Sequence, residues 1–301
     1  MSVAISGSQT KIPTARRASQ AKPKIAERVC CSEGLLPENY VELFTKIAGK
    51  FELCLDENDK VVASLATIEV SEDTVYLGLM SMSRPDSWPY VYQLCKDTVE
   101  KHADKNVFAR VTEEMERACK ITDVLPVRSP WMLVKTVAKV IEPCRLVYRI
   151  PGVTTQPMTP QNLKEGALYD EQVMKSQRDD YLSALTSDKG SFSRVAYEKG
   201  AVCGLLVAQR LHDGSAIATH LVADDKHVAK MLLLEAQNNF PPAAHKGFVL
   251  VVPLMEEGDK HGSYNFAEDL QLVGDRESCL LFSRSALPIA YKKIYSLGDF
   301  V

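Results

Sequence analysis

The chain has 301 residues and a formal net charge of −3, with 46% hydrophobic and 25% charged residues. These values are ordinary for a globular protein, and the length allows two domains, each with its own core. The charge balance gives no reason to expect a nucleic acid partner. No apolar run approaches the roughly 18 residues that a membrane span needs, and no secretory signal follows Met1. We therefore expect a cytoplasmic protein without a membrane partner.

Residues 1–30 predict a disordered basic arm. No acidic residue precedes Glu27, and large apolar side chains are too few to form a core. The basic residues of this arm are Lys11, Arg16, Arg17, Lys22 and Lys24. The same composition also fits a mitochondrial presequence, so the mitochondrial matrix stays open as an alternative compartment.

Eight cysteines are spread along the chain, and none forms a CxxC pair. Cys30 and Cys31 are adjacent, which is a poor spacing for chelating one zinc ion. Most of the others lie in apolar segments, where a free cysteine behaves as a small core residue. The pattern predicts reduced cysteines and no metal site.

Residues 31–150 predict a mixed α/β domain with a mainly antiparallel sheet. A helix begins near Pro37 and ends at Gly49, where glycine suits a helix C-terminus. Tight turns join three strands between Phe51 and Met82, which is typical of an antiparallel meander. The predicted elements that follow are a helix over Trp88–His102, a strand over Asn106–Val111, a helix from Glu113 with Thr112 as N-cap, and strands within 131–140 and 145–150.

Residues 151–301 repeat this order, and the prolines around Thr154 to Thr159 mark the boundary between the halves. A largely helical stretch over Asn162–Leu185 precedes a hairpin that turns at Glu198-Lys199-Gly200. The later elements are a strand over 215–222, a helix capped by Asp224 or Asp225, an apolar strand over 246–254, a short helix over 265–270 and a strand over 278–284. The repeated order predicts two copies of one α/β domain.

Each half contains a strand that points at the N-terminus of a helix, at Leu77–Cys95 and at Ile217–Glu235. This geometry suits a ligand that bears phosphate, because helix N-termini present free N–H groups and a partial positive charge.

Three segments, taken with the order of elements, resemble the GNAT N-acetyltransferase superfamily. They are Tyr169-Asp170…Val173…Arg178…Tyr181-Leu182, Leu221-Val222-Ala223-Asp224-Asp225 and Ile294-Tyr295-Ser296-Leu297-Gly298. The resemblance covers about residues 35–301 and is greatest to tandem members whose second domain is degenerate. It implies two tandem GNAT-like domains and an acyltransferase that uses acetyl-CoA to acylate a small amine.

The resemblance also implies a place for the acetyl-CoA. The pantetheine arm would lie along the strand residues Leu79, Met80, Ser81 and Met82, and Arg84 would face the pyrophosphate. The family pattern has glycines in this turn, but no glycine lies between Gly78 and Gly152. The alternative is therefore a catalytically inactive GNAT-like subunit that binds a protein partner or forms a homo-oligomer.

For the amine, the resemblance points to Tyr169, Asp170 and Arg178, which we expect on one helix with residues 170 and 178 on nearly one face. The alternative for Asp170 and Arg178 is an exposed ion pair or a helix-cap interaction. No catalytic residue is assigned. Side chains considered for proton transfer are Glu69, Glu113, His220 and Tyr264. Trp88, Tyr90 and Tyr92 either stack on a base of the ligand or fill the groove.

Overall fold

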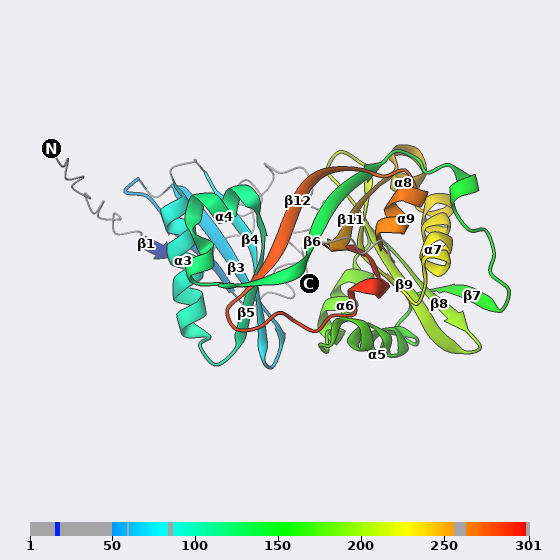
Figure 1. Ribbon diagram of the computed structural model, residues 1–301, viewed down its shortest axis with the longest axis horizontal. Helices are drawn as coiled ribbons and strands as arrows, with labels where there is room; N and C mark the ends of the chain where they lie inside the picture. Colours follow the sequence, from blue (N-terminus) through cyan, green and yellow to red (C-terminus); the bar gives the residue numbers. More distant parts are fainter. Residues whose placement is uncertain (1–15, 19–49, 59, 84–86, 256–262, 299–301) are drawn as a thin grey trace.

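A computed structural model describes residues 16–18, 50–58, 60–83, 87–255 and 263–298 (Figure 1). The helix predicted from Pro37 lies outside these residues, as does most of the predicted arm over 1–30. Within the arm, Arg16–Ala18 form β1, which pairs with β2.

The described chain alternates strands and helices in the predicted order. The strands are β2 Lys50–Leu55, β3 Val61–Ser71, β4 Thr74–Met82, β5 Asn106–Thr112, β6 Val127–Ala138, β7 Val153–Pro157, β8 Ser191–Glu198, β9 Ala201–Arg210, β10 Ala216–Ala223, β11 Phe248–Met255, β12 Val273–Phe282 and β13 Ile294–Leu297. The helices are α3 Trp88–Lys101, α4 Glu113–Cys119, α5 Leu163–Met174, α6 Asp179–Ser187, α7 Lys226–Asn239, α8 Pro241–Lys246 and α9 Ser263–Asp269.

One sheet runs through both halves, in the order β1-β2-β3-β4-β5-β12-β6-β11-β10-β9-β8-β7. Most neighbours are antiparallel, and the parallel pairs are β4 with β5 and β10 with β11. The first half thus contributes an antiparallel meander followed by a parallel strand, and the second half repeats this arrangement. The mixed α/β fold with a mainly antiparallel sheet is confirmed.

The two halves exchange strands at the centre of the sheet (Figure 1). β12 from the second half pairs with β5 of the first half, and β6 from the first half pairs with β11 of the second half. β6 and β12 also pair with each other, so that each half is completed by a strand of the other. The predicted boundary at residue 150 falls in the chain between β6 and β7.

The core has separate clusters on the two faces of this sheet. The helix α3 packs on the first half and the helices α7 to α9 pack on the second, each over its own hydrophobic cluster. On the opposite face, a third cluster continues from one half to the other beneath α5 and α6. It joins Tyr76 and Phe108 of the first half to Leu182 and Leu205 of the second. The halves therefore share apolar packing as well as main-chain hydrogen bonds.

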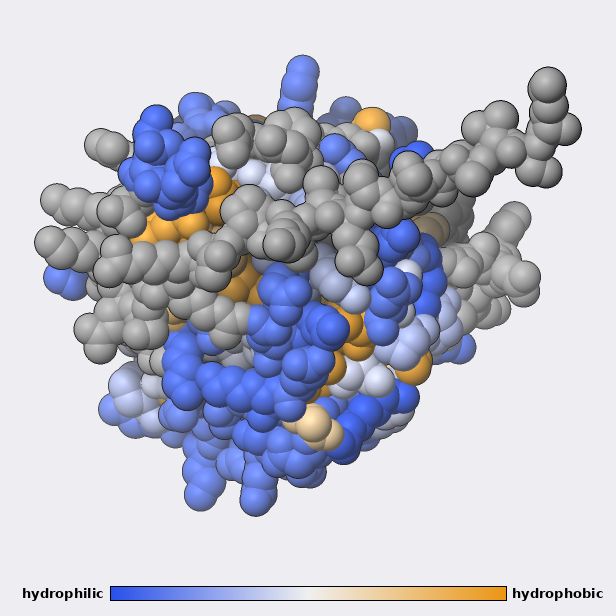
Figure 2. All heavy atoms as spheres, turned by 90° about the vertical axis from the view of Figure 1, so that its left-hand side faces the viewer, coloured by the Kyte–Doolittle hydropathy of each residue, from blue (hydrophilic) through white to orange (hydrophobic). Residues whose placement is uncertain are grey.

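Figure 2 looks onto the end of the molecule formed by the first half, where the visible described surface is mainly hydrophilic. The large hydrophobic side chains that are exposed among the described residues lie elsewhere, on β6, β12, α5 and the segment before β7: Val137, Val140, Tyr148, Leu168 and Val273.

Most predicted elements are confirmed, and one is wrong. Residues 145–150 form no strand, because a short 3-10 helix over Pro143–Arg145 turns the chain at the start of this segment. Residues 153–157, which overlap the predicted boundary segment 154–159, form the edge strand β7, where Pro157 is tolerated at the last position. The boundary itself stays a prediction.

The turn into β11 depends on Gly247, which has φ 86° and ψ −162°, a region that is essentially restricted to glycine. An added Cβ would collide with main-chain atoms of Ala138 and Lys139, at the end of the exchanged strand β6. We therefore expect Gly247→Ala to lower the free energy of unfolding by about 2–5 kcal/mol.

Urea denaturation followed by circular dichroism measures this loss. Gly200→Ala is the matched control, because Gly200 also has a positive φ of 82° but an added Cβ there meets nothing within 4 Å. The control should lose only about 1–2 kcal/mol. Equal losses in the two variants would contradict the role of the close approach to β6.

Candidate functional site

The first half contains a fork between β4 and β5. The two strands pair in parallel only from Thr74 and Asn106 to Leu77 and Ala109. β4 continues beyond this point with β3, as far as the pair Met82 and Ala63. The edge of β4 that faces away from β3 is thus not paired with β5 over the predicted cofactor residues Leu79 to Met82. Main-chain groups on such an edge can bind an extended ligand as they would bind a strand.

Neighbouring side chains anchor this part of β4. The Sγ atom of Cys95 on α3 lies 3.6 Å from the Sδ atom of Met80, and the Oγ atoms of Ser64 and Ser81 are 2.6 Å apart. The side chains of Leu79 and Arg84 lie outside the described residues, so the predicted contact of Arg84 with a pyrophosphate stays a prediction.

The N-terminus of α3 follows this fork and lacks the usual side-chain cap. Ser87 is the N-cap residue, yet its side chain accepts no hydrogen bond from the first turn. Its hydroxyl group is buried and has no hydrogen-bond partner among the described residues. An anion at this helix end would supply acceptor oxygens and would be favoured by the helix dipole. Ser87 and the first turn of α3 therefore suit a phosphate group, such as those of an acyl-CoA.

The second half contains the equivalent fork, but β13 fills it. β10 and β11 pair in parallel only at Ala216 and Ile217, and β13 then pairs antiparallel with β10 over residues 220–222. The Ser296 hydroxyl group joins the two sides of the fork, because it donates to the Ala218 carbonyl at 2.6 Å and accepts from the Val251 N–H at 2.9 Å. The main-chain edge that a ligand would need is occupied by the protein itself.

Carboxylates also occupy the helix N-terminus at the second fork. The Asp225 side chain accepts hydrogen bonds from the N–H groups of His227 and Val228, which confirms one of the two predicted caps of α7. Asp224 lies 3.0 Å from the Tyr169 hydroxyl and 2.8 Å from the Lys293 Nζ atom. Both carboxylates would repel a phosphate at this end of the helix.

The hydroxyl group of Tyr169 contacts protein atoms at the second junction. Its hydroxyl lies within hydrogen-bond distance of the Cys203 carbonyl as well as of Asp224. Burial, together with the negative charge of Asp224, raises the pKa of Tyr169 far above its ordinary value. The hydroxyl thus stays protonated and serves as a donor that ties α5 to the start of α7.

Asp170 and Arg178 meet in a buried ion pair, although they do not share a helix as predicted. α5 ends at Met174 because Lys175 takes a left-handed conformation with φ 57°, and Arg178 precedes α6. The Nε and Nη2 atoms of Arg178 bind the two Asp170 oxygens at 2.9 and 2.7 Å, and the Nε2 atom of His220 lies 2.7 Å from Asp170 Oδ1. These three side chains have at most 1% of their surface exposed.

The charges of this cluster stabilise one another. Burial by itself would favour protonated Asp170, but Arg178 and His220 outweigh this effect and lower the pKa of Asp170. Burial likewise opposes the charge of Arg178, and Asp170 overcomes it and raises the pKa of Arg178. The contacts of this cluster hold α5 and the start of α6 against β10. In the sequence, a single histidine within an apolar strand, His220, indicates such a buried contact.

The other side chains considered for proton transfer lie in different environments. Glu69 is 60% exposed and accepts a hydrogen bond from Lys105, which is the main cause that lowers the pKa of Glu69. Glu113 is 77% exposed on α4, 3.5 Å from Arg117. The side chain of Tyr264 is outside the described residues. Trp88, Tyr90 and Tyr92 pack at the edge of the first-half core.

The described residues contain no group of three or more histidine, cysteine, aspartate or glutamate side chains that could hold a metal ion. None of their helices combines the length and the apolar character needed to cross a membrane.

The strand order and the two forks repeat in both halves, and comparisons with solved structures show that this fold is shared with GNAT proteins. A candidate acetyltransferase from Pyrococcus horikoshii has a TM-score of 0.67 and 16% sequence identity, with 94% of each chain covered. A GCN5-related N-acetyltransferase from Sphaerobacter thermophilus has a TM-score of 0.56 and 13% identity, over 94% of this chain and 96% of the other.

A tandem GNAT protein from the clavulanic acid biosynthesis pathway has a TM-score of 0.59 and 11% identity, over 89% of this chain and 97% of the other. No protein-family model matches the sequence, and no curated protein matches it. The chain thus has the GNAT fold, in two tandem copies as the sequence predicted, with low sequence identity to the proteins that share it.

We expect Asp170→Asn to lower the free energy of unfolding at neutral pH by about 3–5 kcal/mol, because it leaves a buried guanidinium without a charge partner. Chemical denaturation measures the loss. Glu113→Gln is the matched control, since it removes one carboxylate from an exposed pair and should change little. A loss of similar size in both variants would show that the buried cluster does not stabilise the fold.

The stability difference between wild type and Asp170→Asn should also depend on pH. Because the pKa of Asp170 is lowered in the folded state, its contribution is complete above the ordinary carboxyl value of about 3.9 and is lost as the pH falls toward the folded value. Denaturation between about pH 7 and about pH 3 should show the gap narrowing in acid. A gap that stays constant or widens would contradict the lowered pKa.

Proposed function

We propose that this chain is an acyl-CoA-dependent N-acyltransferase that binds acetyl-CoA in the first half only. The supporting observation is the difference between the two forks. The β4–β5 fork has an edge that β5 does not pair and an uncapped helix N-terminus, whereas β13 and Asp225 fill the corresponding places in the second half. One fork is suited to a ligand with an extended arm and phosphates, and the other is closed.

In this proposal the residues of the first fork bind and orient the acyl donor. The main chain of Leu79 to Met82 would hold the pantetheine arm, and Arg84 with the N-terminus of α3 would hold the pyrophosphate. Acetyl-CoA supplies the acyl group as a thioester. A neutral amine attacks the thioester carbonyl carbon, so that a C–N bond forms and the C–S bond breaks. The nitrogen loses one proton to give the amide, and the CoA thiolate takes up one proton to leave as the free thiol.

The protein would contribute mainly by holding the amine and the thioester together, which can account for a large part of the rate enhancement. Glu69 is a weak candidate for the base, because the hydrogen bond from Lys105 favours its ionised form and reduces its basicity. The proposed acceptor is a small amine. The proposed compartment is the cytoplasm, with the mitochondrial matrix as the alternative.

A second candidate function is a catalytically inactive subunit that binds a protein partner or a second copy. The absence of glycine between Gly78 and Gly152 favours it, since backbone N–H groups approach a pyrophosphate most closely at glycine. The aromatic side chains of Trp88, Tyr90 and Tyr92 at the start of α3 favour it as well, because they can take space that a ligand would need.

Titration of acetyl-CoA by calorimetry tests the first proposal against the second. We expect one acetyl-CoA to bind per chain, and Arg84→Glu to weaken binding about tenfold or more, because charge reversal at a diphosphate replaces attraction by repulsion.

Arg149→Glu is the matched control, because this substitution makes the same change in charge at an exposed residue that lies outside both forks. Absence of binding at millimolar acetyl-CoA would contradict the transferase and support the inactive subunit. Equal weakening by the two variants would place the cofactor elsewhere.

A further inference from the structure

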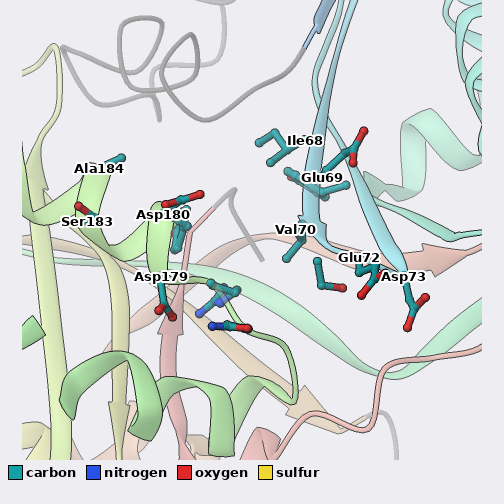
Figure 3. A pocket seen from close by; sticks show the side chains of 14 residues that line it. Ile68, Glu69, Val70, Glu72, Asp73, Asp179, Asp180, Ser183 and Ala184 are labelled. Carbon is teal, nitrogen blue, oxygen red and sulfur yellow. The ribbon is translucent and has the colours of Figure 1, made fainter. Parts of the chain in front are cut away.

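A cavity of about 820 Å³ lies between the two halves, between the β3–β4 hairpin and the start of α6 (Figure 3). One wall comes from residues 68–73 of the first half together with Tyr76, and the other comes from residues 177–181, 183 and 184 of the second half. Its volume is in the range of sites that bind small molecules. Neither half forms this cavity alone.

Acidic side chains line both walls. Figure 3 shows Glu69, Glu72 and Asp73 on one side and Asp179 and Asp180 on the other. Lys105 pairs with Glu69 at 2.9 Å. For the other four carboxylates the described part of the chain provides no ion pair.

Local structure explains each set of acidic residues, but not their juxtaposition. Glu72 and Asp73 form the turn of the hairpin, and Asp179 and Asp180 lie in the first turn of α6, where the helix dipole favours negative charge. Facing one another across a cavity, the two sets repel, and a bound cation would relieve this repulsion. The cavity therefore favours a ligand with more than one positive charge.

Arg178 provides an independent indication of a ligand. Its guanidinium is 1% exposed and it lines the cavity wall. Nε and Nη2 face Asp170, so Nη1 lies on the edge of the guanidinium directed away from Asp170, and it has no hydrogen-bond partner within the described parts of the chain. A buried donor without an acceptor is unfavourable. An oxygen atom of a ligand would satisfy it.

The lining of the cavity ends one residue before the fork of the first half. Tyr76 lines the cavity and immediately precedes Leu77, the last residue of β4 that pairs with β5. Its ring packs against Phe108 of β5, with ring centroids 5.1 Å apart. An amine in the cavity would thus lie beside the point where the two strands separate.

We infer that this cavity binds a small dibasic amine that also carries a carbonyl oxygen, with the cationic groups between the two acidic walls and the oxygen at Arg178. The claim that this ligand is the acceptor of the transferase rests on the proposed function. The claim that it binds in the cavity does not depend on that function. The second half then forms one wall of the acceptor site of the first.

Titration calorimetry with lysinamide, without acetyl-CoA, tests the binding. Lysinamide has two amines and one amide carbonyl. Norleucinamide lacks the second amine, and cadaverine keeps both amines but lacks the carbonyl. We expect norleucinamide to bind about tenfold more weakly than lysinamide, and cadaverine about threefold more weakly.

Two double variants test the walls. We expect Asp179→Asn with Asp180→Asn to weaken lysinamide binding about tenfold, and Glu72→Gln with Asp73→Asn to do the same from the other half. The second variant keeps the test decisive if the first does not fold. Glu114→Gln is the control, because Glu114 is an exposed first-turn carboxylate of α4 outside the cavity. It should leave the affinity unchanged.

Equal affinities for lysinamide and norleucinamide would overturn the inference, as would equal weakening by the wall variants and Glu114→Gln. Failure of the proposed function shows separately, as loss of acetyl-CoA binding while lysinamide still binds. With both ligands present, mass spectrometry should detect a gain of one acetyl group on lysinamide. Acetylation that persists unchanged in both wall variants would place the acceptor outside this cavity.

Discussion

The exchange of β6 and β12 is the constraint on which the rest of the structure depends. Each strand fills the middle of the sheet beside a strand of the other half, and the main-chain hydrogen bonds of β5, β12, β6 and β11 are satisfied only when both halves are folded together. The sheet is therefore continuous, and the two halves cannot rotate independently. A cavity between them consequently has walls in a fixed relation, which a flexible interdomain cleft would not provide.

The same topology explains why the two forks differ. After β12 the chain returns to the first half, where Asn106 binds the Ser285 carbonyl, and then enters the second fork as β13. After β6 the chain instead goes on to begin the second half at β7. Within the described residues, no strand equivalent to β13 enters the first fork. Connectivity alone thus closes one fork, whereas no strand among the described residues fills the other.

Sequence patterns predicted the elements well, because local rules determine them. Thr112 caps α4, Asp225 caps α7, and Lys199 with Gly200 turns the β8–β9 hairpin, as the residue types indicated. Long-range features escaped prediction. The sequence pattern of β13 does not show whether a terminal strand adds to the edge of a sheet or enters a fork between two strands. β13 enters the fork between β10 and β11. Asp170 and Arg178 were predicted to bind the amine, and this role stays a prediction. The break at Lys175 and the contact with His220 depend on tertiary packing.

The second half therefore forms part of the cavity, even though its own fork is closed. The buried cluster of Asp170, Arg178 and His220 fixes the segment between α5 and α6 against β10. This segment leads directly into the first turn of α6, which carries the acidic residues of one cavity wall. Acidic residues are common at the start of a helix and in a hairpin turn. Here the two sets line opposite walls of one cavity of about 820 Å³, and this arrangement requires both halves. In the proposed transferase, the second half would thus determine which amine reaches the first half, although its own fork is closed.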